Sequence, residues 1–361
     1  MNRFSHLSAG LFTFTSFFLA SCDLPSTTQT EIVSEEKPVV AILADRTTHF
    51  GKALEFGANH SANNNGLRLL WQDSIQPDDF EQQITVIQNL IHRRVDGMII
   101  VTQNEIMIRK AVQAAKDQGI PVLLIDSPPL SNTESHGELL SVVATDQSLA
   151  GRLAAEEMAK LLQGKGRVAI IRYSPLSWKT EYRENAFLTQ IRTCPDIEVV
   201  GHDLYAGTDV RRAREKMTHL LQLYAWGNRS KLDGIFISDE STACEMLPLI
   251  DQAKVGKKLY FVAFGTDDSL RTGMLTYRVD ALFAEQPVRM GQLAVDTMAE
   301  LLRGQTTVPF LDSGIHRITI DNLYSPYTQA LIQMEMEEPS EILLNDSPGN
   351  HESVDADENE N

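Results

Sequence analysis

Two stretches of the chain, "RRVDGMIIVTQNE" (residues 93–105) and "SKLDGIFISDEST" (230–242), share one pattern. Each has an apolar residue, then Asp-Gly, then a run of aliphatic residues, and then polar residues. A continuous aliphatic run of this length is typical of a strand that is buried on both faces, as in parallel sheets. The repetition therefore predicts two copies of one α/β lobe rather than one very large sheet.

Strand-like runs, including the two in these stretches, occur from Pro38 to about Arg303 and alternate with segments of helical spacing. In chain order they cover residues 38–45, 67–74, 96–104, 121–127, 166–174, 197–203, 233–241 and 259–267. This alternation predicts the α/β class, with two doubly wound, Rossmann-like lobes whose parallel sheets carry helices on both faces. Ligands in such folds bind beyond the carboxyl ends of the strands, so polar residues there would line a cleft between the lobes.

The charge of the chain is strongly negative. The 361 residues carry a formal net charge of -17, which disfavours a nucleic-acid partner because polyphosphates are bound by clustered Lys and Arg. Residues 332–361 are rich in acidic side chains and contain no Lys or Arg, which predicts a disordered tail. Metal-ligand spacing and catalytic motifs are absent from the sequence, so we expect no metal site, no cofactor and no enzymatic activity.

The amino-terminal segment has the features of an export signal. Arg3 precedes an apolar stretch, residues 7–20, that is too short to span a bilayer. "LASC" (19–22) resembles the lipobox of bacterial lipoproteins, in which the signal is cut before the cysteine and the thiol is lipidated. We therefore expect residues 1–21 to be a lipoprotein signal peptide and Cys22 to carry acyl chains that anchor the protein. An ordinary secreted protein with a small-residue cleavage site is the alternative.

Residues 22–37 are polar and would form a flexible tether between this anchor and the folded body. Asp23, next to the cysteine, resembles an inner-membrane retention signal of some lipoproteins. These features place the expected protein on the periplasmic side of the inner membrane, attached by lipid and not spanning it.

Five segments together resemble the ribose-binding type of periplasmic binding protein, over about residues 38–331. They are "VDGMIIVTQN" (95–104), "AVQAAKDQGIPVLLIDS" (111–127), "VVATDQSLAGRLAAEEMAKLLQGKGRVAIIR" (142–172), "FVAFGTDDSLRTGML" (261–275) and "FAEQPVRMGQLAVDTMAELLRG" (283–304). The resemblance implies a periplasmic-binding-protein-like type I fold with discontinuous lobes. The amino-terminal lobe would comprise 38–145 plus 286–316, and the carboxyl-terminal lobe 146–285 plus 317–331. Three hinge segments are expected near 142–146, 283–287 and 314–318.

The same resemblance implies a function. We expect a monomeric, lipid-anchored solute-binding protein that captures a small carbohydrate-like ligand and delivers it to an ABC transporter. The alternative is a ligand sensor that presents its closed form to a membrane histidine kinase or chemoreceptor.

Family positions that contact sugars fall on three residues with suitable chemistry. Phe50 matches an aromatic plate, although a core aromatic at a helix start is the alternative. Asp126 matches a carboxylate that accepts two sugar hydroxyls, and its alternative is a turn former before Ser127. Arg183 matches an arginine whose planar fork meets neighbouring oxygens, with a surface arginine as the alternative.

Three further candidates depart from the family pattern or align loosely. Trp178 could cover the ligand. Asp239 stands where asparagine is usual and could instead be a helix N-cap. Glu285 stands where glutamine is frequent. Gly265 stands where aspartate is frequent, so an acceptor for sugar hydroxyls is missing there unless Asp267 reaches into the site.

The expected cleft thus holds Asp126, Asp239 and Glu285 against the single cation Arg183. Such a charge balance favours a polyol, an amino sugar or another ligand rich in donor groups over an anion, and a simple pentose remains open.

Overall fold

The computed structural model describes residues 37–73, 78–102, 104–128, 140–225, 231–256, 258–333 and 340–344. The expected signal peptide, Cys22 and most of the acidic tail lie outside these ranges. Within them, each of the two repeated segments forms the middle strand of its own sheet. β3 (Gly97–Val101) comes from the first repeat and β8 (Gly234–Ile237) from the second. The prediction of two α/β lobes is confirmed.

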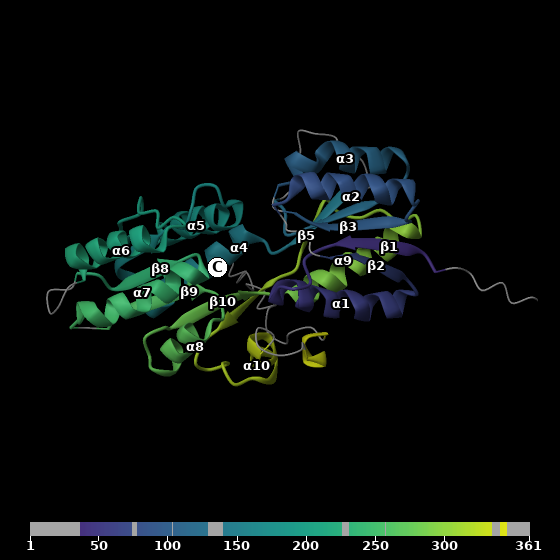
Figure 1. Ribbon diagram of the computed structural model, residues 1–361. Coiled ribbons are helices and arrows are strands. Elements are labelled where there is room, and N and C mark those ends of the chain that lie inside the picture. The colour runs from purple at the N-terminus through teal and green to yellow at the C-terminus, as the bar shows by residue number, and fades with distance from the viewer. Residues whose placement is uncertain are drawn as a thin grey trace, which may run out of the picture. The chain divides into compact units, whose positions relative to one another are not determined.

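The first lobe contains a six-stranded parallel sheet in the order β11-β5-β4-β3-β1-β2. Besides β3, its strands are β1 (Val39–Leu43), β2 (Arg68–Gln72), β4 (Val122–Ile125), β5 (Leu140–Ala144) and β11 (Phe310–Asp312). Two helices cover each face (Figure 1): α2 (Phe80–His92) and α3 (Glu105–Asp117) on one, α1 (His49–Asn65) and α9 (Pro287–Leu302) on the other.

The second lobe repeats this plan with the sheet order β12-β10-β9-β8-β6-β7. Its other strands are β6 (Lys165–Ile171), β7 (Asp196–Val200), β9 (Tyr260–Phe264), β10 (Ala281–Glu285) and β12 (Ile315–Ile318). One face carries α4 (Gln147–Leu161) and α5 (Trp178–Ile191), and the other carries α6 (Val210–Tyr224), α7 (Glu240–Ala253) and α8 (Asp268–Leu275). α10 (Pro326–Gln333) and a short 3-10 turn (Glu341–Leu344) follow.

β12 departs from the expected parallel arrangement because it pairs antiparallel with β10. It also belongs wholly to the second sheet, so the expected first-lobe boundary at residue 316 falls inside a strand and is wrong. The chain crosses earlier, at Ser313 and Gly314. Asp312 Oδ1 accepts a hydrogen bond from Gly314 N at 2.8 Å, and Gly314 has a φ of +80°, which turns the chain there.

The chain passes between the two sheets at three places, which lie next to one another. β5 leads into α4 through Thr145, β10 leads into α9 through Gln286, and β11 leads into β12 through Ser313. Thr145 Oγ1 lies 3.2 Å from Ser313 Oγ, and Asp146 N donates to Asp312 Oδ1 at 2.9 Å. Three adjacent connections of this kind form the expected hinge.

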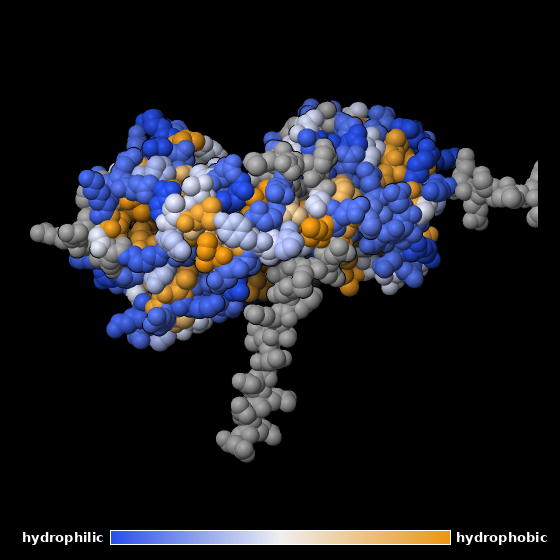
Figure 2. Space-filling model, turned by 90° about the horizontal axis from the view of Figure 1, so that it is seen from below, coloured by the Kyte–Doolittle hydropathy of each residue, from blue (hydrophilic) through white to orange (hydrophobic). Residues whose placement is uncertain are grey.

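One face of the molecule can be followed in Figure 2, and it is mainly polar. On the face seen in Figure 2, hydrophilic residues predominate and hydrophobic ones lie in small separate groups. Within the described ranges, every helix is too short or too polar to cross a bilayer.

Two helix pairs lie unusually close because glycines replace side chains at their contacts. A Cβ at Gly151 of α4 would lie 2.0 Å from the carbonyl oxygen of Arg183 on α5, and one at Gly57 of α1 would lie 1.9 Å from that of Val288 on α9. Real Cβ atoms do not approach backbone that closely. The glycines therefore set the spacing of both pairs, and Gly151 also fixes the position of Arg183.

Replacing Gly151 by alanine is expected to lower the free energy of unfolding by about 2–3 kcal/mol, because backbone must move to admit the methyl group. Urea unfolding measures the loss. Glu156→Ala, an exposed change on the same helix, should stay within about 0.5 kcal/mol of the parent. Equal stability of the two variants would show that α4 and α5 are not in close contact.

Candidate functional site

A cavity of about 390 Å³ lies at the carboxyl ends of the second-lobe strands and extends to the start of α1 in the first lobe. Pockets that bind small ligands have volumes of this order. His49 and Phe50 line it from the first lobe. Most of the remaining wall belongs to α5, to the residues after β8 and β9, and to the end of β10.

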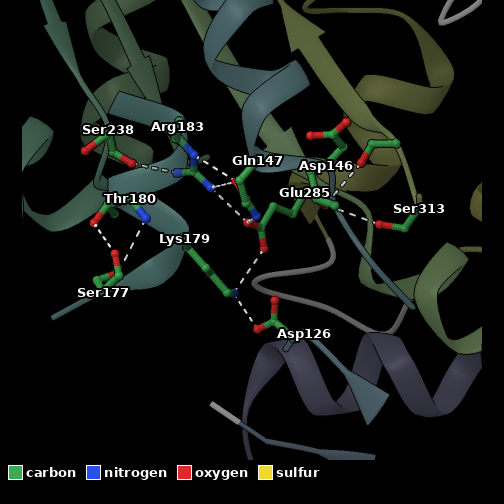
Figure 3. A network of polar contacts seen from close by, with 12 residues as sticks. Asp126, Asp146, Gln147, Ser177, Lys179, Thr180, Arg183, Ser238, Glu285 and Ser313 are labelled. Atoms are coloured by element: carbon green, nitrogen blue, oxygen red, sulfur yellow. Dashed lines mark hydrogen bonds and ion pairs between the residues drawn. The ribbon is translucent and has the colours of Figure 1, made fainter. Parts of the chain in front are cut away.

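Arg183 is the centre of the polar network in this wall (Figure 3). Its side chain is 7% exposed. The guanidinium donates to Gln147 Oε1 from Nε at 3.0 Å and from Nη2 at 2.6 Å, and Nη1 donates to the carbonyl of Ser238 at 2.6 Å. Its Cζ atom lies 3.7 Å from the ring centroid of Phe264. Together with the bond to Glu285 described next, partners within the described residues use four of the five N–H groups of the guanidinium.

Glu285, the last residue of β10, accepts from two sides. Its Oε1 accepts from Gln147 Nε2 at 2.8 Å and from Arg183 Nη2 at 3.0 Å, while Oε2 lies 3.5 Å from Lys179 Nζ. Burial would raise the pKa of Glu285, but the neighbouring Lys179 and Arg183 cations outweigh it and hold the pKa at about 2. Glu285 is therefore an ionised acceptor in the cavity wall.

Asp126 follows β4 and approaches the site from the first lobe; it does not line the cavity itself but contacts Lys179, which does. Its backbone has a φ of +59°, in the left-handed region that aspartate tolerates better than most residues and that is frequent at functional sites. Oδ2 forms an ion pair with Lys179 Nζ, whereas Oδ1 is buried and accepts no hydrogen bond within the described ranges. Burial raises the pKa of Asp126 to about 6; Lys179 opposes the shift, and repulsion from Glu285 adds to it.

Asp239 lines the cavity and also caps α7, so its structural alternative is observed. Oδ1 accepts from Thr242 N and Thr242 Oγ1, both at 2.9 Å, and from Ser241 Oγ at 2.6 Å. A ligand would therefore have to use Oδ2.

The next residue, Glu240, occupies the space beside Gly265. Glu240 Oε1 accepts from Asp267 N at 2.8 Å and from Thr266 N, and a Cβ at Gly265 would lie 2.4 Å from this oxygen. Asp267 instead caps α8 by accepting from Ser269 N at 2.7 Å, and it does not line the cavity. The acceptor near this strand end is thus Glu240 and not Asp267.

The two aromatic candidates are in different places. Phe50, in the first turn of α1, is half-buried and lines the cavity. Trp178 does not line it. Its ring instead packs against apolar residues of the first lobe and lies edge-on to Tyr182, with ring centroids 6.0 Å apart. The ligand contacts proposed for both residues remain predictions.

Sequence reasoning missed Lys179 and Gln147, which both belong to the network in Figure 3. Lys179 lies four residues before Arg183 in "KTEYR". Residues spaced by four share one face of a helix, so the sequence could have predicted that Lys179 lies beside Arg183. The expectation of a single cation in the cleft is therefore wrong: Lys179 and Arg183 face Asp126 and Glu285.

The raised pKa of Asp126 predicts an unusual pH dependence of stability. The pKa of an aspartate is about 3.9 in the unfolded chain and about 6 here in the folded protein, so the folded state binds the proton more tightly. Protonation of Asp126 therefore adds to the free energy of unfolding at low pH, and this stabilisation is lost as the pH rises through about 6. Between pH 5 and pH 8, the free energy of unfolding of the wild type should fall by about 1.4 kcal/mol relative to that of Asp126→Asn, in which residue 126 does not titrate. Urea unfolding of both proteins at the two pH values measures this. A difference that is constant, or that grows in favour of wild type at pH 8, would contradict the shift.

Comparison with known proteins agrees with this geometry. A family model described as "Periplasmic binding protein domain" matches residues 39–306. The ribose import binding protein RbsB of Bacillus subtilis is 24% identical over 301 residues, covering 82% of this chain and 92% of that protein. The xylitol-binding protein of Mycolicibacterium smegmatis is 24% identical, with 61% and 59% covered. An ABC transporter solute binding protein of Burkholderia graminis, solved with D-arabinose, is 26% identical with a TM-score of 0.63, and 80% and 97% are covered. The chain belongs to the periplasmic binding protein family.

Proposed function

We propose that this protein binds a small, polyhydroxylated ligand, a sugar or polyol, in the cavity between its lobes and delivers it to an ABC permease. The observation that carries the proposal is the combination of aromatic and charged groups in one cavity wall. Sugars present hydroxyls around an apolar C–H surface. A site for them therefore needs charge-assisted hydrogen bonds beside aromatic rings.

The charges of the site favour an uncharged ligand. Lys179 and Arg183 are paired with Asp126 and Glu285, and the Asp239 and Glu240 carboxylates add negative charge to the wall. An anionic ligand would be repelled by this surplus, whereas hydroxyls can donate to the carboxylates and accept from the cations. An amino sugar is also compatible. The names of the three related proteins mention ribose, xylitol and D-arabinose, which are uncharged polyhydroxylated molecules.

The three adjacent crossings support delivery as well as capture. Rotation about them would enclose the ligand, and a ligand that contacts both lobes binds the closed form better and so increases its population. A permease that recognises the closed form would then distinguish loaded from empty protein.

Ligand binding can be tested by calorimetry with D-ribose, D-arabinose, xylitol, D-glucosamine and D-glucuronate. We expect one of the first four to bind and D-glucuronate not to. Asp126→Ala and Phe50→Ala should each weaken binding about tenfold or more, because Phe50 lines the cavity and Asp126 pairs with Lys179 in its wall.

Asp203→Ala, an exposed change outside the cavity lining, serves as the control and should bind as wild type does. The proposed site would be refuted by equal affinity in all three variants, and the ligand class by binding of D-glucuronate alone.

Membrane attachment is a separate part of the proposal and rests on the sequence. Cys22 in "LASC" would carry the acyl chains, and residues 22–37 would let the body reach a permease on the periplasmic side of the inner membrane.

Cys22→Ala should abolish incorporation of labelled palmitate in cells and move the protein from the membrane fraction to the soluble fraction. Ser21→Ala, which keeps a small residue before the cysteine, should remain membrane-bound. Palmitate incorporation that persists in the Cys22 variant would exclude this anchor.

A further inference from the structure

The start of α5 belongs to the second lobe, yet its first two residues contact the first. Trp178 packs against the apolar cluster between the first sheet and helices α2 and α3. Lys179 Nζ forms an ion pair with Asp126 Oδ2 at the end of β4. Figure 3 shows the Lys179 side chain extending between Asp126 and Glu285. Both contacts join side chains of the second lobe directly to the first lobe.

The helix that carries these two residues is held firmly in its own lobe. Ser177 caps it, with Oγ accepting from Thr180 N at 3.5 Å. One turn after Lys179, Arg183 is tied to Gln147 and to the Ser238 carbonyl by the hydrogen bonds described above. The backbone of Lys179 is therefore held in a fixed position on the second lobe.

Lys179 neutralises two carboxylates that approach each other when the lobes meet. Its ammonium pairs with Asp126 of the first lobe and lies 3.5 Å from Glu285 Oε2, next to the hinge. Arg183 pairs with Glu285 as well, whereas within the described ranges Lys179 is the one cation at ion-pair distance from Asp126. Without that ammonium, closing would bury the Asp126 carboxylate near a like charge, with the more distant Arg183 as its compensation. Removing one member of a buried ion pair is costly even where the pair itself adds little net stability.

We propose that Lys179 is a positioning residue of the binding site: by neutralising Asp126 in their ion pair it allows the second lobe to close against the first and so sets the fraction of closed protein. Trp178 adds the apolar part of the same contact. The inference rests on the proposed function only in that a sugar or polyol is what the closed lobes would enclose. For a neutral ligand, affinity then depends on an ion pair that lies wholly within the protein.

The test uses Trp178 as a reporter of closing. The chain has three tryptophans, so Trp71→Phe and Trp226→Phe leave Trp178 as the one tryptophan of the full-length protein, and its emission is excited at a wavelength that the tyrosines do not absorb. Acrylamide quenching is measured without any sugar. Lys179→Met should raise the quenching constant about twofold, because an open lobe pair exposes the indole. Lys179→Arg, which keeps the charge, should behave like its parent, as should Lys110→Met, an exposed control on α3.

A second-site change separates this role from damage to α5. Adding Asp126→Asn to Lys179→Met removes the carboxylate charge and should return the quenching constant most of the way to the parent value. A purely structural fault in the helix would not be corrected from the other lobe. The proposal is overturned if Lys179→Met quenches like the parent, or if Asp126→Asn fails to restore it.

These measurements do not depend on the ligand. Calorimetry of the same proteins with D-ribose, D-arabinose and xylitol tests the proposed function separately. An absence of binding together with the expected quenching changes would reject the ligand class and leave the ion pair established.

Discussion

The need to satisfy one buried guanidinium determines how the site is built. Arg183 is almost entirely removed from water, and a buried cation is tolerated only where acceptors replace the lost hydration. Gln147 at the start of α4, the Ser238 carbonyl after β8 and Glu285 at the end of β10 supply those acceptors, and the Phe264 ring covers one face of the guanidinium. One side chain thus ties together the elements that meet at this end of the second lobe.

The same network lies directly beside the hinge. Gln147 follows the first crossing and Glu285 precedes the second, where Tyr327 Oη donates to Gln286 Oε1. The third crossing contacts the first through Ser313 and Thr145. In the proposed function, a ligand that binds Glu285 would therefore act on groups next to the residues about which the lobes would turn. Binding and closing would then share these residues, and no long chain of contacts would be needed to couple them.

Most of the fold was predictable from the sequence because it depends on local pattern. Buried strands such as β3 and β8 are continuous aliphatic runs, and the repeated order of strands and helices indicates two lobes. The first-lobe boundary was expected at residue 316, inside β12, because so short a strand has little pattern of its own. The site was only partly predictable, since the partners of each charge depend on distances between segments far apart in the chain. Nothing in the sequence indicates that Lys179 meets Asp126, although its spacing from Arg183 does place it at the cavity.

The environment of Gly265 shows why single departures from a family pattern mislead. Its φ of +115° and the nearby Glu240 carboxylate leave no room for a side chain at this position, so an aspartate there and the present placement of Glu240 exclude each other. The carboxylate beside the end of β9 comes instead from Glu240 in the first turn of α7, where backbone N–H groups of Thr266 and Asp267 hold it. The negative charge of the wall is kept while its origin moves to a neighbouring element. The charge pattern of this cavity therefore depends on where each carboxylate is held, and a count of acidic residues at aligned positions does not determine it.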